Sequence, residues 1–82
     1  MVTINIRADE SLWRNGMLPE GFITKWLVAD GDQVREGHGI VAVRIEGAVH
    51  DIVAPRDGRV KIEAGVNHVV EPGSLLATLV VG

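Results

Sequence analysis

The chain has 82 residues, of which 8 are basic and 11 acidic, and it contains no cysteine. This length suits a single domain over residues 1–82, and the missing cysteines exclude disulfide bonds and thiolate metal sites. The net charge of −3 argues against a nucleic-acid partner, because phosphate neutralisation requires a basic patch. No apolar run reaches the ~20 residues of a membrane helix, so we also expect no membrane partner.

Ten glycines and three prolines separate runs that are rich in valine and isoleucine. This composition is typical of short strands and tight turns, and no glycine-free window shows the apolar spacing of an amphipathic helix. We therefore predict an all-β fold. Its first strand, over residues 2–6, follows Met1 directly and leaves no room for the basic and apolar regions of a secretion signal, which predicts a cytoplasmic protein.

A long irregular connection over residues 7–20 follows the first strand, and residues 9–14 within it favour one helical turn capped by Asp9 or Ser11. The later apolar runs are each bounded by glycine or proline, and they predict strands over residues 22–28, 40–45, 48–53, 59–64 and 75–81, with short apolar anchors at Val34 and residues 69–70. The two central arms flank Glu46-Gly47, which is a signal for a tight β-hairpin.

Two spaced patterns occur twice in the chain, with an offset of 36 to 37 residues. The repeated patterns are Gly21-x-Ile23 with Gly58-x-Val60, and Val34-x-x-Gly37-x-x-Ile40-x-x-Val43 with Val70-x-x-Gly73-x-x-Leu76-x-x-Leu79. One half is too small to bury its own apolar face, so the halves must pack on each other. We predict a flattened β-barrel or sandwich with a pseudo-two-fold axis, the central hairpin at one end and both termini at the other.

Several spaced motifs follow one another over residues 19–80, namely Gly21-x-Ile23-x-Lys25-Trp26-x-Val28-x-x-Gly31-Asp32-x-Val34-x-x-Gly37, Ala54-Pro55-x-x-Gly58-x-Val60 and Val70-x-x-Gly73-x-x-Leu76. In this order and spacing they resemble the lipoyl and biotinyl attachment domain family. The resemblance implies two four-stranded antiparallel sheets with internal two-fold symmetry, a barrel-sandwich hybrid. It also implies a lysine at the hairpin tip that carries a lipoyl arm, or less readily a biotinyl arm, in 2-oxo acid dehydrogenase complexes and related systems.

The resemblance places the attachment position at Gly47. Counting without gaps from Gly37, or back from Ala54-Pro55, leads to the same residue. No lysine occurs between Lys25 and Lys61. Because lipoate and biotin are held by an amide bond to a lysine amine, the resemblance implies a family member that carries no cofactor and whose Gly47 is unmodified.

Our first hypothesis is therefore a non-catalytic, lipoyl-domain-like module that binds protein partners, such as 2-oxo acid dehydrogenase components. The family fold implies that the loop after the first strand lies beside the hairpin tip, and the residues we expect at a partner surface are Leu12, Trp13, Met17 and Glu46. No nucleophile with a base, no acid–base pair and no cofactor motif stands out, so we do not expect an enzyme that acts alone.

The alternative is a stand-alone scaffold or self-associating sandwich without a role in acyl transfer, with contacts through an edge strand near the termini and the loop over residues 7–20. Trp13 is open to two interpretations, a lid over a thin core or an anchor at an interface. The three histidines, His38, His50 and His68, fall in different loops and strands, and we expect solvated side chains and no metal site.

Overall fold

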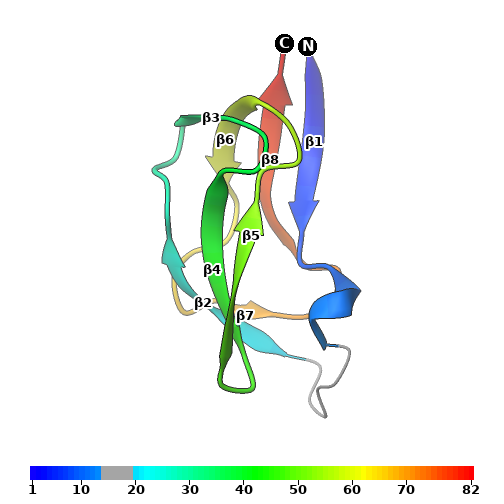
Figure 1. The fold of residues 1–82 in the computed structure, drawn as a ribbon, viewed down its shortest axis with the longest axis vertical. Helices are drawn as coiled ribbons and strands as arrows, with labels where there is room; N and C mark the ends of the chain where they lie inside the picture. The colour runs from blue at the N-terminus through cyan, green and yellow to red at the C-terminus, as the bar shows by residue number, and fades with distance from the viewer. Residues whose placement is uncertain (14–19) are drawn as a thin grey trace.

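The strands form two antiparallel sheets of four strands each (Figure 1) in a computed structural model that describes residues 1–13 and 20–82. Sheet A contains, in spatial order, β1 (Val2–Arg7), β8 (Leu75–Val81), β6 (Gly58–Ile62) and β3 (Gln33–Val34). Sheet B contains β5 (Ala48–Val53), β4 (Gly39–Ile45), β2 (Gly21–Trp26) and β7 (Val69–Val70). The predicted all-β fold and the two four-stranded sheets are confirmed.

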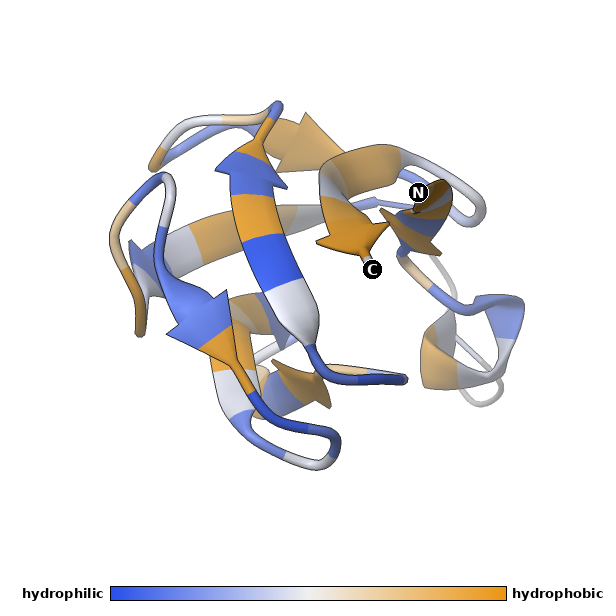
Figure 2. Ribbon diagram, turned by 90° about the horizontal axis from the view of Figure 1, so that it is seen from above, coloured by the Kyte–Doolittle hydropathy of each residue, from blue (hydrophilic) through white to orange (hydrophobic). Residues whose placement is uncertain are grey.

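The two sheets make a sandwich and not a closed barrel. Within the described residues each strand is hydrogen-bonded only to strands of its own sheet, so the sheets keep separate edges. Hydrophobic and hydrophilic residues alternate along the strands (Figure 2), as expected where one face of a sheet is buried. The buried core includes Ile23, Ile40, Val43, Val60, Leu76 and Leu79, none of which is more than 1% exposed.

The internal repeat is visible in the order of the strands. Strands β2, β3 and β4 of the first half correspond to β6, β7 and β8 of the second, and each half contributes its short middle strand to the other half's sheet. Gly21 and Gly58 occupy equivalent positions, because a Cβ would lie 2.7 Å from the Arg44 carbonyl oxygen in one case and 2.6 Å from the Val80 carbonyl oxygen in the other. The same close backbone approach therefore occurs once in each sheet.

The hairpin tip and the chain termini lie at opposite ends of the molecule (Figure 1). At one end Ile45 pairs with Ala48 beside the β4–β5 turn. At the other end Val2 pairs with Val81 beside the termini. Both parts of the predicted arrangement are confirmed, so the tip is the end at which the two halves are joined.

Several predicted segments differ in their bounds from the structure; the strand expected over 59–64, for example, is β6, which ends at Ile62. Strand β2 ends at Trp26, two residues earlier than expected, because its ladder with β4 stops at the Trp26–Val41 pair, next to a register shift between Gly39 and Val41. The helical turn after β1 is the 3₁₀ helix η1 (Glu10–Trp13). Its cap is Asp9, whose Oδ1 accepts a hydrogen bond of 3.0 Å from the Ser11 backbone N–H.

Candidate functional site

The tip of the β4–β5 hairpin is a two-residue turn with a special backbone conformation. Glu46 has φ of 47° and Gly47 has φ of 86°, and both residues are exposed. Positive φ at both central residues is typical of the type I′ turn, whose twist matches the twist of the flanking strands. Local chain geometry thus explains Gly47, since glycine tolerates this region better than any other residue, but it does not explain Glu46.

A side chain at Gly47 would project into solvent. A Cβ built at this position meets no atom of another residue within 4 Å. The two lysines of the chain lie elsewhere, Lys25 exposed on β2 and Lys61 exposed on β6. At Gly47 an attached arm would be free to move, but glycine has no side chain to which an arm could be attached.

The segment after β1 is fixed to the second half of the chain. The Ala8 backbone N–H donates to the Ser74 carbonyl oxygen at 2.9 Å, and the Gly73 N–H donates to the Ala8 carbonyl oxygen at 2.8 Å. Arg7 Nη1 adds a bond of 3.0 Å to the Gly73 carbonyl oxygen. These contacts hold η1 beside the hairpin stem (Figure 1).

The expected partner-surface residues have different environments. Trp13 is only 8% exposed and belongs to the core cluster, which supports the lid interpretation and removes its ring from the accessible surface. Its Nε1 has no hydrogen-bond partner among the described residues, whereas Nε1 of Trp26 donates to the Ala64 carbonyl oxygen at 2.9 Å. Leu12 is half-buried and Glu46 is exposed. Met17 lies outside the described residues.

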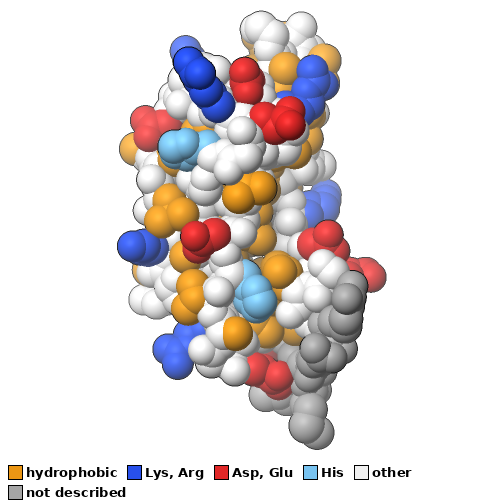
Figure 3. Space-filling model, in the orientation of Figure 1, with side chains coloured by type: hydrophobic (Ala, Val, Ile, Leu, Met, Phe, Trp, Pro, Cys, Tyr) orange, Lys and Arg blue, Asp and Glu red, His pale blue; other side chains and the backbone are white. Residues whose placement is uncertain are grey.

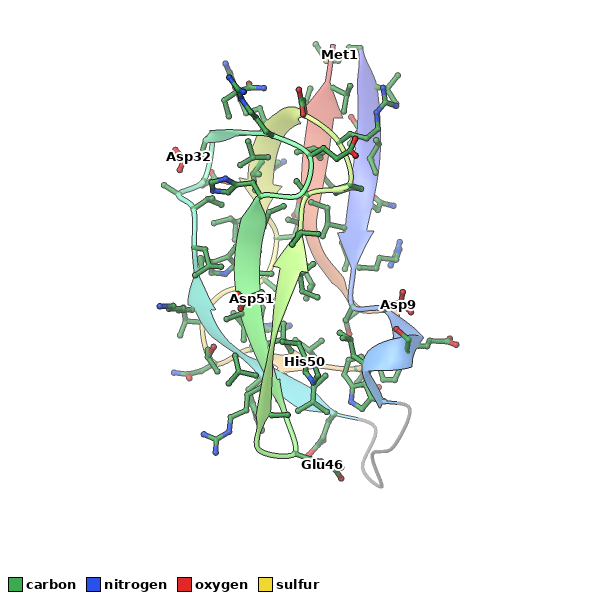
Figure 4. All side chains as sticks on the ribbon, in the orientation of Figure 1. Met1, Asp9, Asp32, Glu46, His50 and Asp51 are labelled. Carbon is green, nitrogen blue, oxygen red and sulfur yellow. The ribbon has the colours of Figure 1, made fainter. Side chains whose placement is uncertain are left out.

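A groove of about 400 Å³ separates η1 and β1 from β5. Leu12 lines it together with Asp51 and Ile52, which lie midway along β5 and not at its tip. His50 extends from β5 on the side of η1, and Asp51 lies on β5 just beyond it (Figure 4). Neither Glu46 nor Gly47 lines the described part of the groove, so the groove brings Leu12 to the middle of the hairpin and not to the attachment position.

Neither a metal-binding cluster nor a membrane-spanning helix occurs among residues 1–13 and 20–82. No three His, Cys, Asp or Glu side chains in these ranges are placed to hold one metal ion together. No helix in the described part of the chain is long and apolar enough to cross a bilayer.

Comparison with known proteins identifies the fold and its hairpin. The family model for biotin and lipoyl attachment, described as biotin-requiring enzymes, matches residues 16–79. The chain belongs to this biotin/lipoyl family. A similar solved structure is the lipoyl domain of the 2-oxoglutarate dehydrogenase complex from Azotobacter vinelandii, with a TM-score of 0.75 and 26% identity over 96% of this chain and 98% of that domain. A search of curated proteins found no significant match.

The family assignment makes the β4–β5 tip the candidate site of this biotin/lipoyl domain. The chain has the strands, the pseudo-two-fold arrangement and the turn that present an attachment residue, and it has glycine at the turn position reached by counting from both sides. The structure places Gly47 as the second residue of the two-residue turn, as the sequence predicts, and its role as the attachment position stays a prediction. What the sequence could not settle was the burial of Trp13, which depends on where the β1–β2 connection packs.

Proposed function

We propose that this biotin/lipoyl domain is a carrier-type module without a carried group, which works by binding protein partners. Gly47 carries the proposal, because glycine offers no amine at the position where the family attaches its cofactor. The domain does not catalyse a reaction by itself. Its proposed partners are components of a 2-oxo acid dehydrogenase complex, as suggested by the similarity to the Azotobacter vinelandii lipoyl domain.

The local geometry supports a tip that has kept its shape without its arm. The turn has positive φ at both residues and the direction of a Cβ at Gly47 is open. A lysine at this position would thus be presented to a ligase with no steric obstruction from the described residues. Glu46, the other turn residue, is exposed at the end of the molecule and would contact a partner that docks on the tip.

The test is co-expression of the chain with a lipoyl ligase and lipoate, and separately with a biotin ligase and biotin, followed by intact-mass measurement. We expect no mass gain on the natural sequence and a single lipoyl addition on Gly47→Lys. The matched control is Gly65→Lys, which places a lysine at another exposed glycine with open space around it and should remain unmodified. Modification of Lys25 or Lys61 in the natural sequence would contradict the proposal.

A further inference from the structure

Large hydrophobic side chains are exposed on one sheet of the sandwich. Outside the first two residues and the loop residue Val66, the exposed large hydrophobics of the described chain are Phe22, Leu27, Val49, Val53 and Val69, with exposed fractions of 37% to 59%. All of them belong to sheet B or to the residue that directly follows β2. Figure 3 shows apolar side chains interspersed with charged ones over β4 and β5. Large apolar side chains that are exposed together on one face are typical of an interaction surface.

The strand register orders these residues into three rows on the outer face of sheet B, since directly paired residues share a face. The tip row contains Val69, Phe22, Arg44 and Val49; the charged row contains Lys25, Ala42 and Asp51; and the far row contains Leu27, Gly39 and Val53. Leu27 belongs to the far row because its Cδ1 lies 3.1 Å from the position of a Cβ at Gly39.

The equivalent face of sheet A exposes fewer large apolar side chains, and its apolar residues Val80 and Leu75, at the positions of Arg44 and Gly39, are half-buried. Its matching row runs Gln33, Arg59, Val80, Thr3 through the same series of antiparallel pairs. Leu27 corresponds to Glu63, because their backbone N–H groups donate to the equivalent residues Ile40 and Leu76. The five apolar residues Phe22, Leu27, Val49, Val53 and Val69 are thus replaced on sheet A by Arg59, Glu63, Thr3, Arg7 and Gln33. The fold alone does not require the exposed apolar side chains.

We propose that the outer face of sheet B binds the same face of a second copy of this chain, around a two-fold axis that runs along β4. Such an axis places β2 of one copy over β5 of the other. Phe22 then faces Val49 of the second copy, and Leu27 faces Val53. Lys25 faces Asp51 of the second copy, and every contact occurs twice, as an isologous interface requires.

The residues on the axis permit close approach of the two sheets. Ala42 is only 3% exposed and Leu27 lies over Gly39, so neither residue protrudes, and the side chains of β2 and β5 make the contacts with the facing copy. Arg44 lies on the axis in the tip row, where its long side chain can turn its guanidinium toward solvent. Gly39 and Arg44 are five positions apart on β4, so the three rows extend about 17 Å along the strand, and the contact is smaller than the roughly 800 Å² per partner of a standard interface, as in a weak dimer.

The charged row favours a second copy of the chain over a partner whose surface is only acidic or only basic. Lys25 and Asp51 lie on either side of Ala42, so the row is complementary to itself when it is turned about β4. On sheet A the corresponding row contains Lys61, Thr78 and Asn5, which lacks an acid and is not complementary to itself. The dimer is independent of cofactor attachment, and it would place both hairpin tips at the same end of the assembly.

Sedimentation equilibrium of the full chain tests association directly, since the monomer has a mass of 8.8 kDa and the dimer twice that mass. We expect the dimer to be populated on approaching about 1 mM protein. A purely monomeric chain at that concentration would overturn the proposal. Phe22→Thr should raise the dissociation constant about tenfold or more, because buried aromatic residues dominate interfaces. Arg59→Thr, at the equivalent position of sheet A, should leave it unchanged.

The arrangement is tested by reversing charges within the charged row. Lys25→Asp and Asp51→Lys each place like charges opposite one another twice in the dimer, and each should weaken association about tenfold or more. An equal mixture of the two variants restores opposite charges at both contacts and should form a heterodimer with nearly the natural affinity. The control Lys61→Asp changes charge equally on sheet A and should have no effect.

Results of the charge reversal decide between this dimer and others. Single variants that associate like the natural chain, or a mixture that fails to recover association while both variants keep their native circular dichroism, would overturn the proposed axis. A concentration-dependent change in amide chemical shifts confined to residues of sheet A would overturn the proposed face. The ligase experiment on Gly47 has no bearing on these outcomes, so the two proposals fail separately.

Discussion

The two halves of the molecule share their buried residues but not their exposed ones. Residues at equivalent inner positions are Ile23 and Val60, Val34 and Val70, Ile40 and Leu76, and Val43 and Leu79, all buried. At equivalent outer positions Phe22 corresponds to Arg59 and Val69 to Gln33. The repeat therefore keeps what packing of the sandwich requires and leaves the outer faces free to differ, so a feature found on one face only points to something beyond folding.

The two ends of the molecule also have equivalent strand pairs but differ in how the chain continues beyond them. The termini lie where the pseudo-two-fold axis would place a second hairpin tip, with the Val2–Val81 pair corresponding to Ile45–Ala48. Only one end closes with a turn, so only one end can present an attachment residue on a rigid hairpin. In this chain the turn consists of Glu46 and Gly47, and Gly47 has no side chain.

The largest expected effect tests whether the two halves of the chain contribute equally to the stability of the core. Ile40→Ala and Leu76→Ala each remove a side chain with no exposed surface, and each should destabilise the fold by about 2–5 kcal/mol. Chemical denaturation at low protein concentration measures both. Where an alanine variant is unfolded from the start, the corresponding valine variant gives a smaller, measurable loss. Very different losses for Ile40 and Leu76 would show that the halves do not contribute equally.

A smaller effect should follow from filling the two close backbone approaches. Gly21→Ala and Gly58→Ala bring a methyl group to less than 3 Å from a carbonyl oxygen, and we expect each to destabilise the fold by about 1–3 kcal/mol. Thermal denaturation gives the comparison. Gly65→Ala is the matched control, because its Cβ meets nothing within 4 Å and its backbone does not need glycine. A loss at Gly65 equal to that at Gly21 would contradict the steric cause.

The tip should be more tolerant than either glycine in the sheets. Gly47→Lys meets no neighbouring atom, and its expected loss of about 1 kcal/mol arises from a side chain in the left-handed region alone. Gly47→Asn should lose less, since asparagine adopts this region more easily. Urea denaturation of both variants measures the difference. A loss as large as that of Gly21→Ala would mean that the tip depends on glycine for more than backbone conformation.

The fold was predictable where the sequence pattern is local. The hairpin arm 48–53 and the last strand 75–81 have the predicted bounds, because Gly47 and Pro55 bound the first run and Gly73 and Gly82 bound the second. The early end of β2 was not predictable, since it depends on where the ladder with β4 stops. The turn at Glu46-Gly47 was predictable from the sequence, and Gly47 as the attachment position stays a prediction. The apolar rows of sheet B could not be predicted, because they join residues on strands far apart in the sequence.

The smallest expected effect on folding is that of substitutions on the outer faces of the two sheets, which should matter much less for stability than substitutions in the core. Phe22→Thr and Arg59→Thr replace exposed residues at equivalent positions by one that strands favour, and both should change the free energy of unfolding of the monomer by under about 1 kcal/mol. Denaturation at low micromolar protein measures stability, and sedimentation at high concentration measures association. Phe22→Thr should weaken association without a large change in stability, and Arg59→Thr should change neither association nor stability. A large loss of monomer stability at Phe22 would mean that its ring supports the fold, and the contrast between the two faces would then have a folding cause.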